Sequence, residues 1–117
     1  MKKEEFQREL QEQLKNPQSS IATKAVIQSV LTKEKEKTGS NVRNWAIVAQ
    51  ECMELGLECN EVIRGTSDRL NLLQEFADVM IACTFIQEMA SFSNEEIEAA
   101  IRVKTNYLVK RDDACGR

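Results

Sequence analysis

Short interruptions divide this chain into five helical segments, and this division constrains the fold more than any other feature of the sequence. The chain has only four glycines and one proline, and most of them stand where one helix would end or the next begin. Pro17 suits the first turn of a helix, Gly65 suits the position after one, and the Ser-Asn-Glu-Glu stretch at 93–96 matches a capping box. The predicted helices span about residues 2–15, 18–37, 41–64, 68–90 and 93–112. Since no alternating strand pattern and no repeat occurs, we expect an all-α fold, a four- to five-helix bundle.

Length and composition favour one globular domain. The 117 residues fit a single helical domain, 1–117, in which residues 1–37 form leading helices. A net charge of −3 argues against a nucleic-acid binder, and no apolar run reaches the roughly 20 residues that span a bilayer. The first ten residues carry acids where a signal peptide has its apolar core, and four cysteines without a CxxC pair favour reduced, mostly buried thiols. We therefore expect a cytoplasmic protein with no nucleic-acid or membrane partner.

The third predicted helix carries a row of four glutamates along one side. At about 100° per residue, the four fall within about 80° of one another. They are Glu51, Glu54, Glu58 and Glu61. Apolar residues expected to face the core lie directly beside this row, among them Val48 and Leu55. Like charges at these spacings repel, and a solvated face usually interleaves lysines to relieve the repulsion, but none intervenes here.

The fourth predicted helix places two further acids, Glu75 and Asp78, in apolar surroundings. Its other residues are apolar nearly all round, which is typical of a buried helix. Buried carboxylates need cations or hydrogen-bond donors, because desolvating an unpaired charge costs several kcal/mol. Two acid pairs at i, i+3 on adjacent helices can converge on one point. Carboxylate oxygens without histidine or thiolate companions suit Mg²⁺ or Mn²⁺.

A second interpretation of these acids is a network of buried salt bridges. Four basic residues are available as partners, namely Arg64, Arg69, Lys104 and Arg111. Spacing alone does not decide between this network and a metal site. A di-iron carboxylate centre is excluded, because it requires a Glu-x-x-His motif and the chain has no histidine.

The acid pattern resembles a family signature. Glu51-x-x-Glu54, followed after 20 residues by Glu75-x-x-Asp78, resembles the ExxE…ExxD motif of the MazG-like all-α nucleotide pyrophosphohydrolases. The stretches ECMEL, LLQEFADVMI and SNEEIEAAIRVKTNYLVKR are similar to the family's flanking sequence, so the resemblance covers about residues 42–111. Gln50 and Gln74 stand where many members carry an additional glutamate, which leaves the number of metal ions open.

The resemblance implies Mg²⁺-dependent hydrolysis of a nucleoside triphosphate to the monophosphate and pyrophosphate. It assigns catalysis and metal binding to the four motif acids, which are Glu51, Glu54, Glu75 and Asp78. Glu58, one turn further on from Glu54, is a candidate additional ligand. One of these acids or Glu58 would orient the attacking water as general base, and we favour Glu51. Neither the motif nor the composition identifies which nucleobase the substrate carries.

Candidate substrate-binding residues lie mainly on the last predicted helix. Lys104, Tyr107 and Arg111 share one face there and can contact phosphates, although a solvated helix edge explains them equally well. Trp45, the sole tryptophan, can stack on a nucleobase, but its place on the helix favours packing in the core or in an interface.

An alternative function keeps the fold without the chemistry. A catalytically idle helical module for oligomerisation or regulatory binding fits the same helix pattern, but it gives no reason to retain buried carboxylates. Either function is compatible with a homodimer or homotetramer, which the resemblance also implies. The third helix adds a second apolar band, away from the first, that a monomer would leave exposed. It consists of Ala46, Ala49, Met53 and Leu57.

Overall fold

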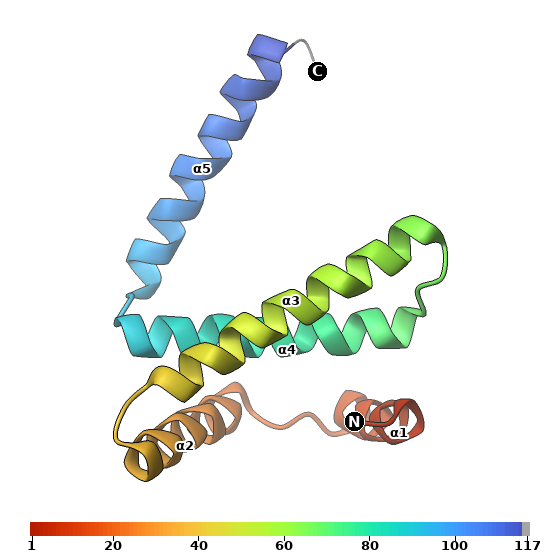
Figure 1. The fold of residues 1–117 in the computed structure, drawn as a ribbon, viewed down its shortest axis with the longest axis vertical. Coiled ribbons are helices and arrows are strands. Elements are labelled where there is room, and N and C mark those ends of the chain that lie inside the picture. The colour runs from red at the N-terminus through yellow and green to blue at the C-terminus, as the bar shows by residue number, and fades with distance from the viewer. Residues whose placement is uncertain (116–117) are drawn as a thin grey trace.

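The computed structural model describes the backbone of residues 1–115 and the side chains of residues 1–111, and its five helices confirm the all-α prediction (Figure 1). No strand occurs within this range. In chain order the helices are α1 (Lys3–Lys15), α2 (Ser20–Thr38), α3 (Val42–Arg64), α4 (Arg69–Ala90) and α5 (Asn94–Cys115). None of them is both long enough and apolar enough to cross a membrane.

The predicted signals that end and begin helices act as expected at Gly65 and at the capping box before α5, but not at Pro17. Gly39 and Gly65 follow α2 and α3 with φ of 81° and 75°, a left-handed conformation that glycine adopts without steric penalty. Before α5, the Ser93 backbone N–H donates to the Glu96 carboxylate at 3.0 Å, and the Glu96 N–H donates to the Ser93 hydroxyl at 3.1 Å. This reciprocal pair is the expected capping box.

The placement of Pro17 in the first turn of a helix is wrong. α2 begins three residues later, at Ser20, and Ser19 is its N-cap. The Ser19 hydroxyl accepts a hydrogen bond from the backbone N–H of Ala22 at 3.1 Å. A serine side chain satisfies a free N–H at a helix start, which proline does not, so Pro17 remains in the connection between α1 and α2.

The α3–α4 pair forms the centre of the fold, with the two helices side by side and joined by a short connection (Figure 1). α2 contacts both helices, and the core lies where it meets them. Four buried side chains form this core, and four half-buried ones surround it. The buried ones are Leu31, Val48, Ala82 and Phe85, and the surrounding ones are Ile27, Ile47, Ile86 and Met89. The core therefore occupies the early part of α3 and the late part of α4.

One buried polar residue, Asn44, ties α2 to α3. Its side chain is fully buried, and its Nδ2 group donates to the Leu31 carbonyl at 3.3 Å and to Oδ1 of Asn41 at 3.2 Å. The bond to Leu31 joins the end of α2 that reaches the core to the first turn of α3. Because a buried amide N–H must find an acceptor, the bond to Leu31 helps to fix how the two helices meet, whereas Oδ1 of Asn44 has no partner among the described residues.

Large apolar surfaces remain exposed in the single chain. α4 was expected to be buried, but Phe76, Met80 and Ile81 on it are 53%, 54% and 43% exposed. The expectation of mostly buried thiols is also wrong, since Cys52, Cys59 and Cys83 are exposed; the Cys115 side chain lies outside the described residues. The reason is the same in both cases: α5 makes no packing contact with α1–α4, so α3 and α4 lack a cover on one side.

We predict that Asn44→Ala lowers the free energy of unfolding by about 1–3 kcal/mol, because it removes the buried hydrogen bonds between α2 and α3. Urea unfolding followed by circular dichroism measures the change. Asn60, an exposed asparagine on the same helix, is the matched control, and Asn60→Ala should shift the midpoint little. Equal destabilisation by the two substitutions would contradict the structural role of Asn44.

Candidate metal centre

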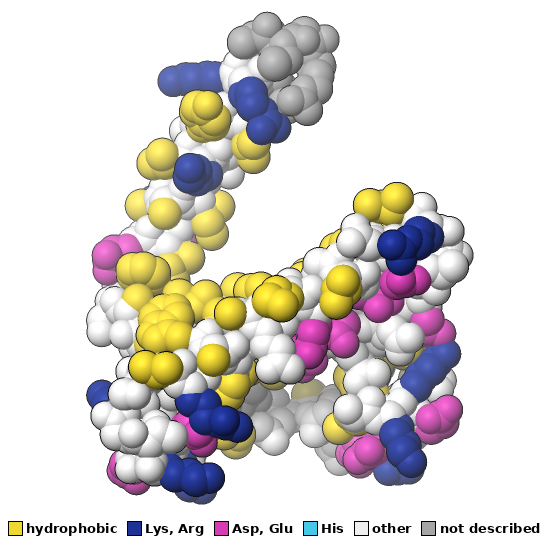
Figure 2. All heavy atoms as spheres, in the orientation of Figure 1, with side chains coloured by type: hydrophobic (Ala, Val, Ile, Leu, Met, Phe, Trp, Pro, Cys, Tyr) yellow, Lys and Arg dark blue, Asp and Glu magenta, His cyan; other side chains and the backbone are white. Residues whose placement is uncertain are grey.

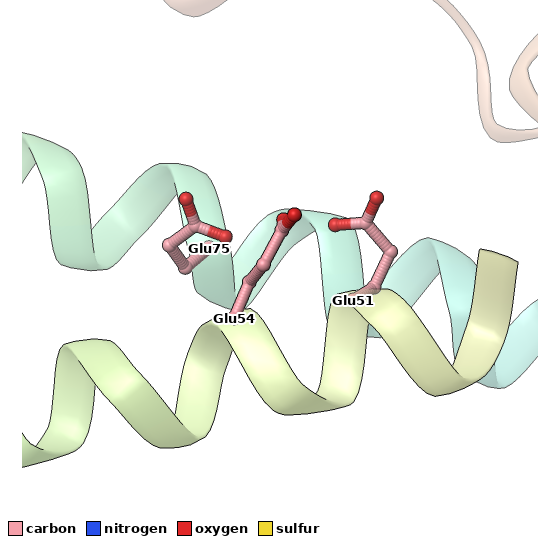
Figure 3. Close-up of side chains that lie close together, drawn as sticks. All are labelled: Glu51, Glu54 and Glu75. Atoms are coloured by element: carbon pink, nitrogen blue, oxygen red, sulfur yellow. The ribbon is translucent and has the colours of Figure 1, made fainter.

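Three carboxylates from two helices meet at one point of the α3–α4 pair. Glu51 and Glu54 stand one turn apart on α3, and Glu75 lies across from them on α4 (Figure 3). One oxygen of each lies within 4.8 Å of one oxygen of both others. Figure 3 shows all three side chains on the same side of the helix pair, with Glu54 between the other two. The i, i+3 spacing thus places both α3 acids against α4, as the sequence predicts.

The fourth predicted ligand, Asp78, lies beside Glu51 but outside the three-carboxylate group. Glu51 and Asp78 share a small cavity of about 80 Å³ whose other lining is apolar. That lining consists of Ile47, Ile81, Ala82 and Phe85. The cavity borders the core, so this end of the acid cluster is the drier one.

The electrostatics of the cluster are those of acids held together without neutralisation. Burial, together with the charges of Asp78 and Glu54, raises the pKa of Glu51 to about 7. The pKa values of Glu75 and Asp78 are also raised, first by burial and then by the charge of Glu54; the amino-terminal ammonium group offsets part of both rises. Three neighbouring carboxyls therefore resist ionisation more than isolated carboxyls do.

Two oxygens of the cluster have no hydrogen-bond partner. Oε2 of Glu51 and Oε2 of Glu75 are buried, and no donor reaches either of them in the described part of the chain. Buried polar atoms in folded proteins nearly always have partners, so each orphan oxygen points to a missing donor or cation. A hard divalent cation such as Mg²⁺ satisfies carboxylate oxygens of this kind, and the donor set contains no softer ligand.

The structure gives no support to the alternative of a salt-bridge network. Among the described residues, none of the four motif acids forms an ion pair with a lysine or arginine side chain. Arg64 pairs instead with Glu61, at 2.9 Å, near the end of α3. Glu61 also accepts a hydrogen bond from Thr66, so this fourth glutamate of the row serves the end of the helix and lies apart from the cluster.

Neighbouring polar groups orient the acids at the other end of the cluster. Gln50 donates through Nε2 to Oε1 of Glu54 at 3.1 Å, and Ser67 donates its hydroxyl to Oε1 of Glu58 at 2.8 Å. The charge of Glu58 contributes to the raised pKa of Glu75, but Glu58 lies outside the three-carboxylate group, so its role as an additional ligand stays a prediction. Sequence reasoning missed the roles of Gln50 and Ser67. The i, i+4 spacing of Gln50 and Glu54 is the signal that would have shown the first of them.

The predicted substrate-binding residues are not brought to the carboxylates within one chain. Lys104, Tyr107 and Arg111 lie on α5, which makes no packing contact with α3 or α4. Trp45 lies near the start of α3 and is 43% exposed, so it does not pack in the core of the single chain. The geometry brings together three acids of the motif, with Asp78 beside Glu51, and the phosphate-binding roles stay predictions.

We predict that, without divalent ions, stability falls as the pH rises from about 4.5 to about 7. In this window the unfolded chain has already released the Glu51 proton, whereas the folded protein still binds it. For each such proton, the free energy of unfolding therefore decreases by up to about 1.4 kcal/mol for every pH unit of increase. Glu75 and Asp78 act in the same direction. Urea unfolding in the presence of EDTA at several pH values measures the slope.

The control for this pH dependence is an exposed glutamate. Glu51→Gln should flatten the slope, whereas Glu36→Gln, on α2, should leave it unchanged. A stability that rises between pH 4.5 and pH 7 in the parent protein would contradict the raised pKa of Glu51.

Comparison of the chain with models of known families, with curated proteins and with solved structures finds no match. The resemblance to the MazG-like pyrophosphohydrolases therefore rests on the motif residues themselves and on their meeting at one place in the fold.

Proposed function

We propose that this protein hydrolyses a nucleoside triphosphate to the monophosphate and pyrophosphate with the help of Mg²⁺. One observation carries the proposal: three carboxylates on two helices converge within 4.8 Å, and two of their buried oxygens lack any partner. A cluster of this kind destabilises the fold, since the acids repel one another and resist ionisation. Binding of a cation would neutralise the carboxylates and so offset this destabilisation.

The chemistry required at the site is the cleavage of one phosphoanhydride bond. The oxygen of a water molecule forms a new bond to the α-phosphorus, the bond from that phosphorus to its bridging oxygen breaks, and pyrophosphate leaves with the electron pair. Bound Mg²⁺ would neutralise the phosphate oxygens and position them for this attack. Glu54 and Glu75 are the residues best placed to hold the cation, because both belong to the three-carboxylate group and one buried oxygen of Glu75 lacks a partner.

Glu51 is the candidate general base. It stands at the dry end of the cluster beside Asp78 and the apolar cavity, where its carboxyl group has a pKa near 7. A carboxylate with a pKa in this range accepts a proton from water more readily than an ordinary glutamate does. Gln50 supports the arrangement by holding Glu54 in place from the same helix.

The substrate class follows from the motif together with the donor set. Carboxylate ligands alone bind a cation but do not select a phosphate chain, so the choice of a nucleoside triphosphate rests on the ExxE…ExxD resemblance. A catalytically idle module stays the second interpretation, and the exposed apolar faces of α4 and α5 favour a binding role. Product analysis separates the two.

We expect the purified protein, supplied with Mg²⁺ and a panel of nucleoside triphosphates, to release pyrophosphate and a nucleoside monophosphate. EDTA should abolish the reaction. Glu54→Gln should lower kcat/KM by more than about 100-fold, since even residues behind metal ligands contribute about 10- to 100-fold. Chromatography of the products measures the outcome, with Glu36→Gln as the matched control. Release of orthophosphate with a nucleoside diphosphate would show cleavage of a different bond and refute the mechanism.

We also expect Mg²⁺ to raise the melting temperature at neutral pH. A concentration ten times the Kd adds about 1.4 kcal/mol to the stability of the folded state, which corresponds to a shift of several degrees in a domain of this size. Glu54→Gln should remove most of this gain, and Asp78→Asn should remove less, because Asp78 lies outside the three-carboxylate group. Differential scanning calorimetry measures the shifts, and an Mg²⁺ gain unchanged in Glu54→Gln would contradict the site.

A further inference from the structure

Asp68 continues the acidic side of α4 towards the start of the helix. It stands about two turns before Glu75, and at about 100° per residue the two side chains fall within about 20° of each other. Asp68 is also the N-cap of α4, and its Oδ1 accepts hydrogen bonds from the N–H groups of Leu70 at 2.8 Å and Asn71 at 3.3 Å. α4 therefore carries a row of acids, Asp68, Glu75 and Asp78, that is longer than the motif.

α1 packs against α4 and against no other helix in the described part of the chain. Figure 1 shows α1 beside the start of α4 and α2 beside its later part, with the connection at 16–19 running between them. In Figure 2, which has the same orientation, acidic side chains gather between α3 and α4, and charged side chains of both signs lie on α1 below them. α1 is thus placed next to the half of α4 that carries the acid row.

Two interactions place the first residues of α1 along this row. Lys3 forms an ion pair with Asp68, in which the lysine Nζ donates to Oδ2. The amino-terminal ammonium group counteracts the rise in the pKa of Glu75 and in that of Asp78, so Met1 lies near both acids. The start of α1 therefore extends along α4 from Asp68 to the edge of the candidate metal centre.

The attachment of α1 to α4 is weak. None of the residues of α1 is buried, and only Phe6 and Leu10 are half-buried. The side chains of Lys3 and Asp68 are 44% and 35% exposed, and ion pairs with such exposure contribute little and weaken with salt. A free helix of 13 residues is only marginally stable in water. α1 can therefore leave α4 and lose its helical structure without disturbing the core, which contains no residue of α1.

A docked α1 and a divalent cation make opposite demands on the acid cluster. Mg²⁺ usually keeps several of its water molecules when it binds carboxylates, so it requires open space in front of Glu51, Glu54 and Glu75. The docked start of α1 takes up space beside Glu75 and adds a positive charge there. Like charges repel, so each of the two occupants disfavours the other.

We propose that α1 is a detachable strap held by the ion pair of Lys3 and Asp68, and that its docking on α4 opposes the binding of a divalent cation at the acid cluster. By thermodynamic linkage, the cation weakens the docking of α1 by the same factor by which docked α1 weakens the binding of the cation. This coupling regulates access to the metal centre. It rests on the proposed function for the presence of a cation, but it does not depend on hydrolysis of a nucleotide.

Asp68→Asn tests the coupling, because it breaks the ion pair but keeps the helix cap. Asparagine caps helices as well as aspartate does, so α4 should stay intact. Release of α1 should lower the Kd for Mg²⁺, measured by isothermal titration calorimetry, by about two- to fivefold, the range that loss of an exposed ion pair allows. Removal of a nearby negative charge without release of α1 predicts the opposite, a weaker affinity.

Two further variants complete the calorimetric test. Lys3→Gln breaks the same ion pair from the side of α1 and should also tighten the binding of Mg²⁺. Glu61→Gln is the matched control, because it removes an acid from the row on α3, which α1 does not contact, and it should not tighten the binding.

Hydrogen exchange provides the reciprocal measurement. In the parent protein, Mg²⁺ should speed the exchange of amide hydrogens in α1, residues 3–15, and should leave that of α2, residues 20–38, unchanged. Mass spectrometry of peptides from the exchanged protein measures both. Slower exchange in α1 with Mg²⁺ would show that α1 closes over the loaded site, and it would overturn the proposal.

Failure of the strap and failure of the metal centre give different results. If Mg²⁺ binds Asp68→Asn with the same affinity as the parent protein, or more weakly, the strap is refuted and the metal centre stands. If Mg²⁺ binds neither protein, the metal centre is refuted and the coupling with it.

Discussion

The packing of α3 against α4 is the contact on which the rest of this structure depends. It brings Glu75 of one helix against Glu51 and Glu54 of the other, with an oxygen of each within 4.8 Å of the others. The same contact sets Val48 against Ala82 and Phe85 in the core. Apolar burial at one end of the helix pair thus offsets the repulsion among carboxylates at its middle. Loss of the core packing would therefore also separate the acids, because the same helix contact holds both.

The position of α2 decides how dry the acid cluster becomes. α2 covers only the part of the pair where Leu31 meets Val48 and Phe85, and Asn44 holds it there. The cluster lies beside this covered region, and Glu51 and Asp78 line a small, mostly apolar cavity there, whereas Glu54 and Glu75 do not line it. A graded environment of this kind gives neighbouring carboxyls different tasks, because burial raises a pKa whereas exposure leaves room for a ligand.

An exposed apolar groove and the candidate site lie on the same pair of helices, α3 and α4. The groove on α3 and α4 is lined mainly by apolar residues, and α5 makes no packing contact with the other helices of its own chain. The groove stays exposed in the single chain. A partner that covers this helix pair would therefore change the surroundings of the acid cluster as well.

The sequence by itself determined the five helices, most of their ends and the identity of the clustered acids. Gly65 and the pair Ser93 and Glu96 act through bonds to neighbouring residues, so local sequence is sufficient to locate them. Glu51 and Glu54 share one face of α3 because of their i, i+3 spacing, which the local sequence shows, whereas their meeting with Glu75 depends on the packing of α3 against α4. Only the tertiary structure decided which surfaces are covered. The exposure of Phe76 and Cys59, the position of Asp78 beside a cavity and the separation of Lys104 from the acids depend on where α2 and α5 lie, and helix periodicity carries no information about the direction a chain takes at a corner.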